Sequence, residues 1–332
     1  MGRIIDADSH LLEPLDLWER YIEPKYRERC LRFVLRPDKN PYMAMVEGAR
    51  ARINVEDILG VIAGFGQKEE GVALGAFDVS QLLSQDMGKR IEFLEEEGIE
   101  CQFLYPSLGL LTDGLVEDGE LAAAHCHAYN TWVLEVCAGH RKRLFPIGHI
   151  TLRHPSLAVA ELERLAKEGI RGVLVAAMPV AGKSFGHPDY DPVWAAAQAH
   201  DLAVGIHIVV HPYYIGNEWH KEPNPGFMWE SMNDIQDPRM ALTTIVYGGV
   251  FERFPRLRVA TVESSSGWVV EWMDRVDYRY AYMGHTTQMK RPASEYFAQH
   301  LGLGRPGGAF AALHGRDGRR RQILHRLGLP PR

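Results

Sequence analysis

The chain has 332 residues, of which 46% are hydrophobic and 24% charged, and this composition is typical of a globular protein. Its formal net charge of −6 at pH 7 gives no reason to expect a nucleic-acid partner. The four cysteines form no C-x-x-C pair, which argues against a zinc ribbon or a disulfide framework. We find no apolar run of about 18 residues and no signal-peptide core, so we expect no membrane segment and a cytoplasmic location.

Short apolar runs that resemble buried strands alternate with amphipathic, helix-like segments along most of the chain. The predicted strands are 4–8, 99–105, 144–150, 172–175, 203–210 and 257–262. The predicted helices are 87–97, 120–138, 155–167, 192–200 and 267–275. No G-x-G-x-x-G motif follows a strand, which argues against a dinucleotide-binding fold. Repeated strand–helix units rich in Val, Ile and Leu predict an α/β protein with most of a (β/α)8 TIM barrel.

Two segments depart from this alternation. Residues 11–85 are rich in Arg, Pro and aromatic residues, and we predict that they form an insertion over the barrel mouth. Residues 301–332 hold seven Arg, seven Gly and one acidic residue, which gives this end a local charge of about +6 and is typical of a basic tail. We therefore divide the chain into a barrel, 1–297, and an aberrant basic Gly/Arg-rich tail, 298–332.

The first predicted strand ends in Asp6-Ala7-Asp8-Ser9-His10. A period of two places Asp6, Asp8 and His10 on one side of the strand. In a barrel, such side chains at the C-terminal end of a strand face the active-site mouth. A carboxylate oxygen and an imidazole nitrogen suit Zn²⁺, Mn²⁺ or Fe²⁺, so the segment indicates a metal site. The alternative is a strand end whose polar residues contact only the next loop.

Two later strands also end in polar residues. His207 lies at the end of the fifth predicted strand, and together with the first site we expect it to be a further metal ligand; the alternative is a hydrogen-bonded structural histidine. Glu263 follows the sixth strand, where it could serve as a general base, a ligand or a partner that orients one. The alternative for Glu263 is a carboxylate favoured by the dipole of the next helix. Because the sequence contains no G-x-S-x-G motif, a metal acting as Lewis acid is the more economical chemistry.

Three further histidines are weaker candidates. His211, directly before Pro212, joins Glu263 as a candidate catalytic residue. His187 precedes Pro188 in a predicted loop and could contact a substrate. His149 lies near the end of the third predicted strand, where it could line the pocket.

Several segments of the chain match a known pattern in order and spacing. They are IDADSHLLEP (5–14), QFLYPS (102–107), RLFP (143–146), GVLV (172–175), HPDYDPVW (187–194) and GVFERFPRLRVA (249–260). Over roughly residues 3–297 they resemble the amidohydrolase-related family that includes aminocarboxymuconate-semialdehyde decarboxylase and γ-resorcylate decarboxylase. The resemblance implies a (β/α)8 barrel with one divalent metal ion, Zn²⁺ or Mn²⁺.

The resemblance also assigns residues to this metal. Asp8 and His10 match the first-strand ligand pair, with a carboxylate in place of the first histidine, and His207 matches the fifth-strand ligand. Glu263 falls where many members have a catalytic histidine. The implied partner is a small carboxylated molecule, with a homodimer by analogy to other members. We therefore predict a non-oxidative decarboxylase of a small aromatic or enol-type carboxylate. Two alternatives stay open: a metal-dependent hydrolase acting through activated water, and a catalytically degenerate barrel.

The family's last ligand is an aspartate after strand eight, usually in Ser-Asp-Tyr-Pro-His, and this sequence has no such segment. Read one nucleotide later, codons for 301–306 can encode Trp-Val-Ser-Ala-Asp-Pro, and those for 327–331 can encode Ser-Asp-Tyr-Pro-His. The first resembles the family's seventh strand and the second its aspartate motif. We therefore hypothesise that residues from about 298 onward are a frameshift product, so that strands seven and eight are lost. Because the barrel then cannot close and one metal ligand is missing, we predict that this 332-residue form is poorly soluble or inactive.

Overall fold

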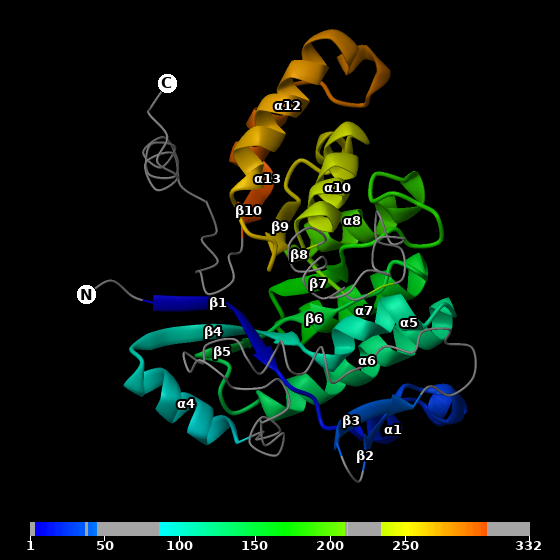
Figure 1. The fold of residues 1–332 in the computed structure, drawn as a ribbon, viewed down its shortest axis with the longest axis vertical. Helices are drawn as coiled ribbons and strands as arrows, with labels where there is room; N and C mark the ends of the chain where they lie inside the picture. The colour runs from blue at the N-terminus through cyan, green and yellow to red at the C-terminus, as the bar shows by residue number, and fades with distance from the viewer. Residues whose placement is uncertain (1–3, 37–38, 45–85, 210, 212–233, 304–332) are drawn as a thin grey trace.

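The computed structural model describes residues 4–36, 39–44, 86–209, 211 and 234–303 (Figure 1). Its main strands are β1 (Ile4–Leu11), β4 (Ile99–Pro106), β5 (Leu144–Pro146), β6 (Gly148–His149), β7 (Gly172–Ala176), β8 (Ala203–His207), β9 (Arg258–Val262) and β10 (Leu301–Leu303). All of them pair in parallel, in the orders β1-β4-β5 and β10-β9-β8-β7-β6. Neighbours in space are therefore neighbours in sequence, as in a (β/α)8 barrel.

The two sheets are parts of one wall. The predicted strand 144–150 divides into β5 and β6 around Ile147, whose N–H donates to the carbonyl oxygen of Leu104 at 3.0 Å. Among the described residues no pairing closes β10 onto β1, so the strands form an open arc of a barrel. This confirms the predicted barrel-type architecture. Although the sequence predicted the loss of strand seven, β10 pairs in parallel with β9, where a seventh strand would lie. The rest of the predicted frameshifted tail, 304–332, lies outside the described residues.

The helices cover the outer side of this arc (Figure 1). The longer ones are α4 (Met87–Glu96), α6 (Gly119–Val136), α7 (Pro155–Lys167), α8 (Asp191–Ala199), α10 (Asp234–Tyr247), α12 (Trp268–Met283) and α13 (Ala293–His300). The short ones are α1 (Leu17–Tyr21), α5 (Thr112–Leu115) and α11 (Val250–Arg253), with 3-10 turns η1 (Pro24–Arg29), η2 (Leu108–Leu111), η3 (Pro188–Tyr190) and η6 (Gly284–Thr286). Among the described helices, none is long and apolar enough to cross a lipid bilayer.

Local sequence signals explain where several helices begin and end. Asp86 and Asp118 cap α4 and α6, since each carboxylate accepts hydrogen bonds from two backbone N–H groups of the first turn. Gly98 and Gly169 follow α4 and α7 with φ values of +67° and +83°, the left-handed conformation that ends many helices. α12 runs to Met283, eight residues beyond the predicted 275.

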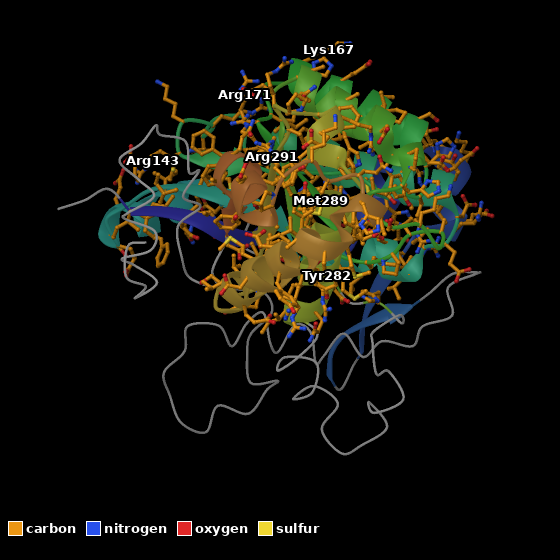
Figure 2. The ribbon with its side chains drawn as sticks, turned by 90° about the horizontal axis from the view of Figure 1, so that it is seen from above. Arg143, Lys167, Arg171, Tyr282, Met289 and Arg291 are labelled. Atoms are coloured by element: carbon orange, nitrogen blue, oxygen red, sulfur yellow. The ribbon has the colours of Figure 1, made fainter. Side chains whose placement is uncertain are left out.

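Figure 2 shows Arg143, Lys167 and Arg171 along one edge of the molecule, with Tyr282 of α12 on the opposite side.

Part of the predicted insertion packs on α6. The fully buried Trp18 of α1 donates from Nε1 to the carbonyl oxygen of His125 at 3.3 Å, and the N–H of Leu31 donates to Nε2 of His125 at 2.9 Å. A hairpin of β2 (Arg32–Arg36) and β3 (Lys39–Ala44) follows. Residues 45–85 lie outside the described residues, so the cover over the barrel mouth stays a prediction.

Candidate metal centre

β1 carries two of the predicted ligands, but its side chains do not alternate regularly. Its pairing with β4 shifts register between Asp6 and Ser9. The Asp6 carboxylate accepts hydrogen bonds from Nε2 of Gln102 at 2.9 Å and from the N–H of Asp8 at 3.3 Å. The prediction that Asp6 lies with Asp8 and His10 is therefore wrong, because the irregularity interrupts the period of two on which it depended.

Asp8, His10 and His207 converge at the C-terminal ends of β1 and β8. One ligand atom from each residue lies within 4.8 Å of the others. Oδ1 of Asp8 is 3.8 Å from Nε2 of His207 and 4.0 Å from Nε2 of His10. The two imidazole rings meet edge to face, with their centroids 5.3 Å apart. The structure thus brings together three residues that the sequence placed on two separate strands, Asp8 and His10 on the first and His207 on the fifth.

The second ring nitrogen of each histidine is fixed by a backbone carbonyl. Nδ1 of His10 lies 2.7 Å from the carbonyl oxygen of Pro106, and Nδ1 of His207 lies 2.6 Å from that of Ile208. Because a carbonyl oxygen only accepts, each Nδ1 must carry the proton and donate it. Each Nε2 then keeps its lone pair and faces Asp8. Metal-binding histidines are oriented in the same way by the partner of their other nitrogen.

The burial of these atoms tests whether the residues fit a cation. Oδ1 of Asp8 and Nε2 of His207 are buried and have no hydrogen-bond partner among the described residues. Their side chains are 3% and 0% exposed. Buried polar atoms without a partner are uncommon and costly, and a divalent cation between them would supply what both lack. The residues therefore fit a metal ion.

The pKa values of these groups agree with this fit. Burial and, to a smaller extent, the charge of Asp6 raise the pKa of Asp8, and a hydrogen bond from the Glu263 backbone lowers it, so that the pKa is about 7. Burial, together with the neighbouring His10, lowers the pKa of His207 to about 3. Burial also lowers the pKa of His10. Both imidazoles are thus neutral near pH 7, which is the form that binds a metal.

Glu263 belongs to the same cluster. Its Oε2 lies 3.5 Å from Nε2 of His207 and 3.8 Å from Nε2 of His10, and its side chain is 21% exposed. Its φ is +53°, and that of Ser265 is +54°, a conformation that non-glycine residues rarely adopt. Such strain costs on the order of 1–3 kcal/mol and concentrates at functional sites. α12 begins only at Trp268, so Glu263 is not in the first turn of that helix. The alternative that the helix dipole alone favours this carboxylate is therefore not supported.

Comparisons with known proteins support the architecture. Residues 5–311 match the amidohydrolase family. The chain belongs to this amidohydrolase family. It is 25% identical over 229 residues, 65% of this chain and 67% of the relative, to γ-resorcylate decarboxylase of Polaromonas sp. strain JS666. The family that the sequence motifs predicted is thus confirmed.

Solved structures show the same fold. A crystal structure of an amidohydrolase from Mycobacterium avium subsp. paratuberculosis K-10 superposes with a TM-score of 0.77 at 21% identity, covering 98% of this chain and 87% of that one. The 5-carboxyvanillate decarboxylase of Novosphingobium aromaticivorans, solved with manganese and 4-hydroxy-3-methoxy-5-nitrobenzoic acid, gives a TM-score of 0.62 at 15% identity, covering 91% and 78%. At these identities the likeness establishes the fold alone.

The other predicted residues of this amidohydrolase family member lie in separate polar pairs. Nε2 of His211 is 2.9 Å from Oδ2 of Asp237, which lies on α10. Nε2 of the buried His149 is 3.4 Å from Oδ2 of Asp113. His187 lies at the N-cap of η3, where its Nδ1 accepts from the N–H of Asp189 at 3.2 Å. Its side chain is 41% exposed.

Sequence reasoning missed an aromatic neighbour of the cluster. Tyr105, at the end of β4, is buried, and its ring centroid lies 5.3 Å from that of His207 and 6.1 Å from that of His10. Burial and the charge of Asp8 raise its pKa, so its hydroxyl stays protonated. Its place in QFLYPS, at the end of a predicted strand, was the available signal, because side chains there face the barrel mouth.

Proposed function

We propose that this protein is a metal-dependent carboxy-lyase that removes CO2 from a small aromatic or enol-type carboxylate. The observation that carries the proposal is the Asp8–His10–His207 cluster, in which neutral imidazole nitrogens and a buried carboxylate oxygen face one another. The γ-resorcylate decarboxylase relative and the manganese-containing 5-carboxyvanillate decarboxylase support this reaction class.

Asp8, His10 and His207 would hold one divalent ion, Mn²⁺ or Zn²⁺. Two nitrogen ligands and one oxygen ligand suit both metals, and the neighbouring structure with manganese favours Mn²⁺. When bound, the ion would supply a Lewis acid for the carboxylate of the substrate and an adjacent oxygen.

Decarboxylation leaves the electron pair of the broken C–C bond on the former carboxyl-bearing carbon, which must then receive a proton. We assign this transfer to Glu263, because its carboxyl group lies beside the cluster and remains partly exposed. His211 is the second candidate, since its contact with Asp237 would fix the orientation of the imidazole. His149 and His187 stay proposed substrate contacts, and their replacement should then raise KM.

A hydrolase is the second candidate function. Glu263 as a carboxylate beside a metal could accept a proton from water, which a hydrolytic reaction requires. A homodimer and a cytoplasmic location are further proposals, which light scattering and cell fractionation would test.

The deciding experiment supplies the frame-restored chain with Mn²⁺ and assays hydroxybenzoates, lactones and amides, with the present chain compared under the same conditions. We expect CO2 release from a hydroxybenzoate-type substrate, with loss of activity in Asp8→Asn and His207→Ala. Uptake of water by a lactone or amide without CO2 release would favour the hydrolase. If the chain binds no divalent ion, the enzyme proposal fails and a degenerate barrel is the better description.

A further inference from the structure

A half-buried arginine of α4 contacts the strand that carries two of the cluster residues. Nη1 of Arg90 donates to Oγ of Ser9 at 3.3 Å and to Oε1 of Gln102 at 3.0 Å. Nη2 of Arg90 donates to the backbone carbonyl oxygen of His10 at 2.9 Å. The guanidinium therefore binds β1 through a side chain and a backbone group, and binds β4 through an amide.

The same network reaches the residue before the cluster. Nε2 of Gln102 donates to the carboxylate of Asp6 at 2.9 Å, so the Arg90–Gln102 pair contacts both Asp6 and Ser9. These are the two positions between which β1 shifts register against β4. A register shift interrupts the regular hydrogen-bond ladder of a strand pair. Side-chain bonds from Arg90 and Gln102 hold β1 where that ladder is irregular.

The position of Arg90 is costly in free energy. Its acceptors in this network are a hydroxyl, an amide and a backbone carbonyl, all of them neutral. A half-buried cation whose acceptors are all neutral gains less from these contacts than it would from a carboxylate. A role in positioning other groups accounts for it.

We propose that Arg90 is a positioning residue of the metal centre: by binding Ser9, the His10 carbonyl and Gln102, it holds β1 in the conformation that directs Asp8 and His10 toward His207. This inference rests on the proposed metal site. Partners that orient metal ligands typically change affinity by about 10- to 100-fold when they are removed.

Arg141 offers a matched control. Its guanidinium, like that of Arg90, donates to backbone carbonyl groups, in this case those of Glu168 at 2.7 Å and Leu134 at 3.2 Å. The carbonyl of Glu168 lies at the C-terminal end of α7, and that of Leu134 lies in α6. In these two hydrogen bonds Arg141 therefore binds helices, and not the strands β1 and β8 that carry the cluster. Arg141→Met therefore removes the same kind of interaction from a region away from the cluster.

The experiment measures the Kd of Mn²⁺ by calorimetry, with electron paramagnetic resonance of the bound ion as a second readout. Wild type, Arg90→Met, Arg90→Lys, Gln102→Met and Arg141→Met are compared after circular dichroism has verified folding. We expect about 10- to 100-fold weaker binding and an altered Mn²⁺ spectrum in Arg90→Met, with a smaller loss in Arg90→Lys and Gln102→Met. Arg141→Met should bind like wild type.

Several outcomes overturn the inference. An unchanged Kd in folded Arg90→Met would do so, as would an equal loss in Arg141→Met, which would indicate general destabilisation. If Arg90→Met does not fold, wild-type affinity in both Arg90→Lys and Gln102→Met would be decisive against it. Absence of Mn²⁺ binding by the wild type would instead overturn the proposed metal centre itself, and the role of Arg90 with it.

Discussion

Oδ1 of Asp8 lies 3.8 Å from Nε2 of His207, and neither atom has a hydrogen-bond partner among the described residues. The two atoms come from the first and the fifth strand of the barrel arc, and each would be better accommodated beside a cation. These atoms are expected to lower the stability of the metal-free protein while they serve metal binding, because a buried ligand group without a metal has lost its water and gained no partner.

The substitution Asp8→Asn tests this expectation. Burial raises the pKa of Asp8 to about 7, so its ionised form destabilises the metal-free fold as the pH rises from 3.8 toward 7. The amide removes this cost. We expect Mn²⁺ affinity to fall by at least about 100-fold, since a direct ligand is lost, while Tm of the metal-free protein rises by at least about 2 °C. Calorimetric titration and thermal unfolding measure the two effects. A lower Tm at pH 8 without metal would contradict the explanation.

Glu161 predicts a loss of stability in acid. Burial raises its pKa, but hydrogen bonds from His127 and Arg164 outweigh this and lower it from 4.5 to about 2. A lowered pKa in the folded state contributes stability that is present above the unfolded value and is lost as pH falls through the folded value. The free energy of unfolding should therefore decrease between pH 4.5 and 2, by on the order of 3 kcal/mol from this group. Glu161→Gln should flatten the curve in this window, and an unchanged slope would contradict the assignment.

Glu13 predicts the opposite dependence in a higher window. Burial raises its pKa from 4.5 to about 7, although N–H groups of Gly109, Leu108 and Ser107 donate to its carboxylate and oppose the shift. A raised pKa means that the folded state binds more protons, so this group's contribution to stability falls as the pH rises from 4.5 to 7. The raised pKa of Asp8 also lowers stability over this pH range. The contribution of Glu13 is therefore measured as the difference in unfolding free energy between wild type and Glu13→Gln at each pH. Denaturant unfolding should show a shallower decline in the variant.

Removal of the Glu13 side chain should be more severe than its neutralisation. Glu13→Ala leaves buried N–H groups of η2 and its preceding residue without their acceptor. An unsatisfied buried group costs on the order of 1–3 kcal/mol, so we expect a larger loss of unfolding free energy than in Glu13→Gln. Equal losses in the two variants would contradict this explanation, because Gln keeps an acceptor oxygen for these N–H groups and Ala does not.

The sequence predicted the residues of the cluster, but it did not predict the residues that hold β1 in place. Asp8 and His10 lie in the second half of β1, His207 ends β8 and Glu263 directly follows β9. Parallel strands bring such residues to one end of a barrel. Arg90 could not be found in this way, because its position in an amphipathic helix does not indicate which strand that helix covers. The period of two also failed at Asp6, since a register shift depends on pairing with β4 and leaves no mark in β1 alone.

The frameshift hypothesis is tested by DNA and by metal binding. Resequencing codons 295–302 should reveal a one-nucleotide difference that restores Trp-Val-Ser-Ala-Asp-Pro at codons 301–306 and Ser-Asp-Tyr-Pro-His at codons 327–331. A frame-restored chain should bind Mn²⁺ more tightly than the present one, because an aspartate ligand joins the set. Calorimetry of both chains under one buffer measures this. An intact frame with unrelated codons, or equal affinities, would remove the hypothesis.

Glu263→Gln separates proton transfer from metal binding. The amide keeps the size of the side chain and its place 3.5 Å from His207, but it cannot exchange a proton near pH 7. A general acid or base typically contributes about 10²- to 10⁴-fold to the rate, so we expect kcat to fall by that factor while the Kd of Mn²⁺ stays within a few-fold of wild type. His211→Asn provides the comparison, because His211 is the competing candidate for the same step. If kcat falls in His211→Asn and is retained in Glu263→Gln, the proton passes through the imidazole paired with Asp237, and Glu263 is assigned to metal binding or substrate contact instead.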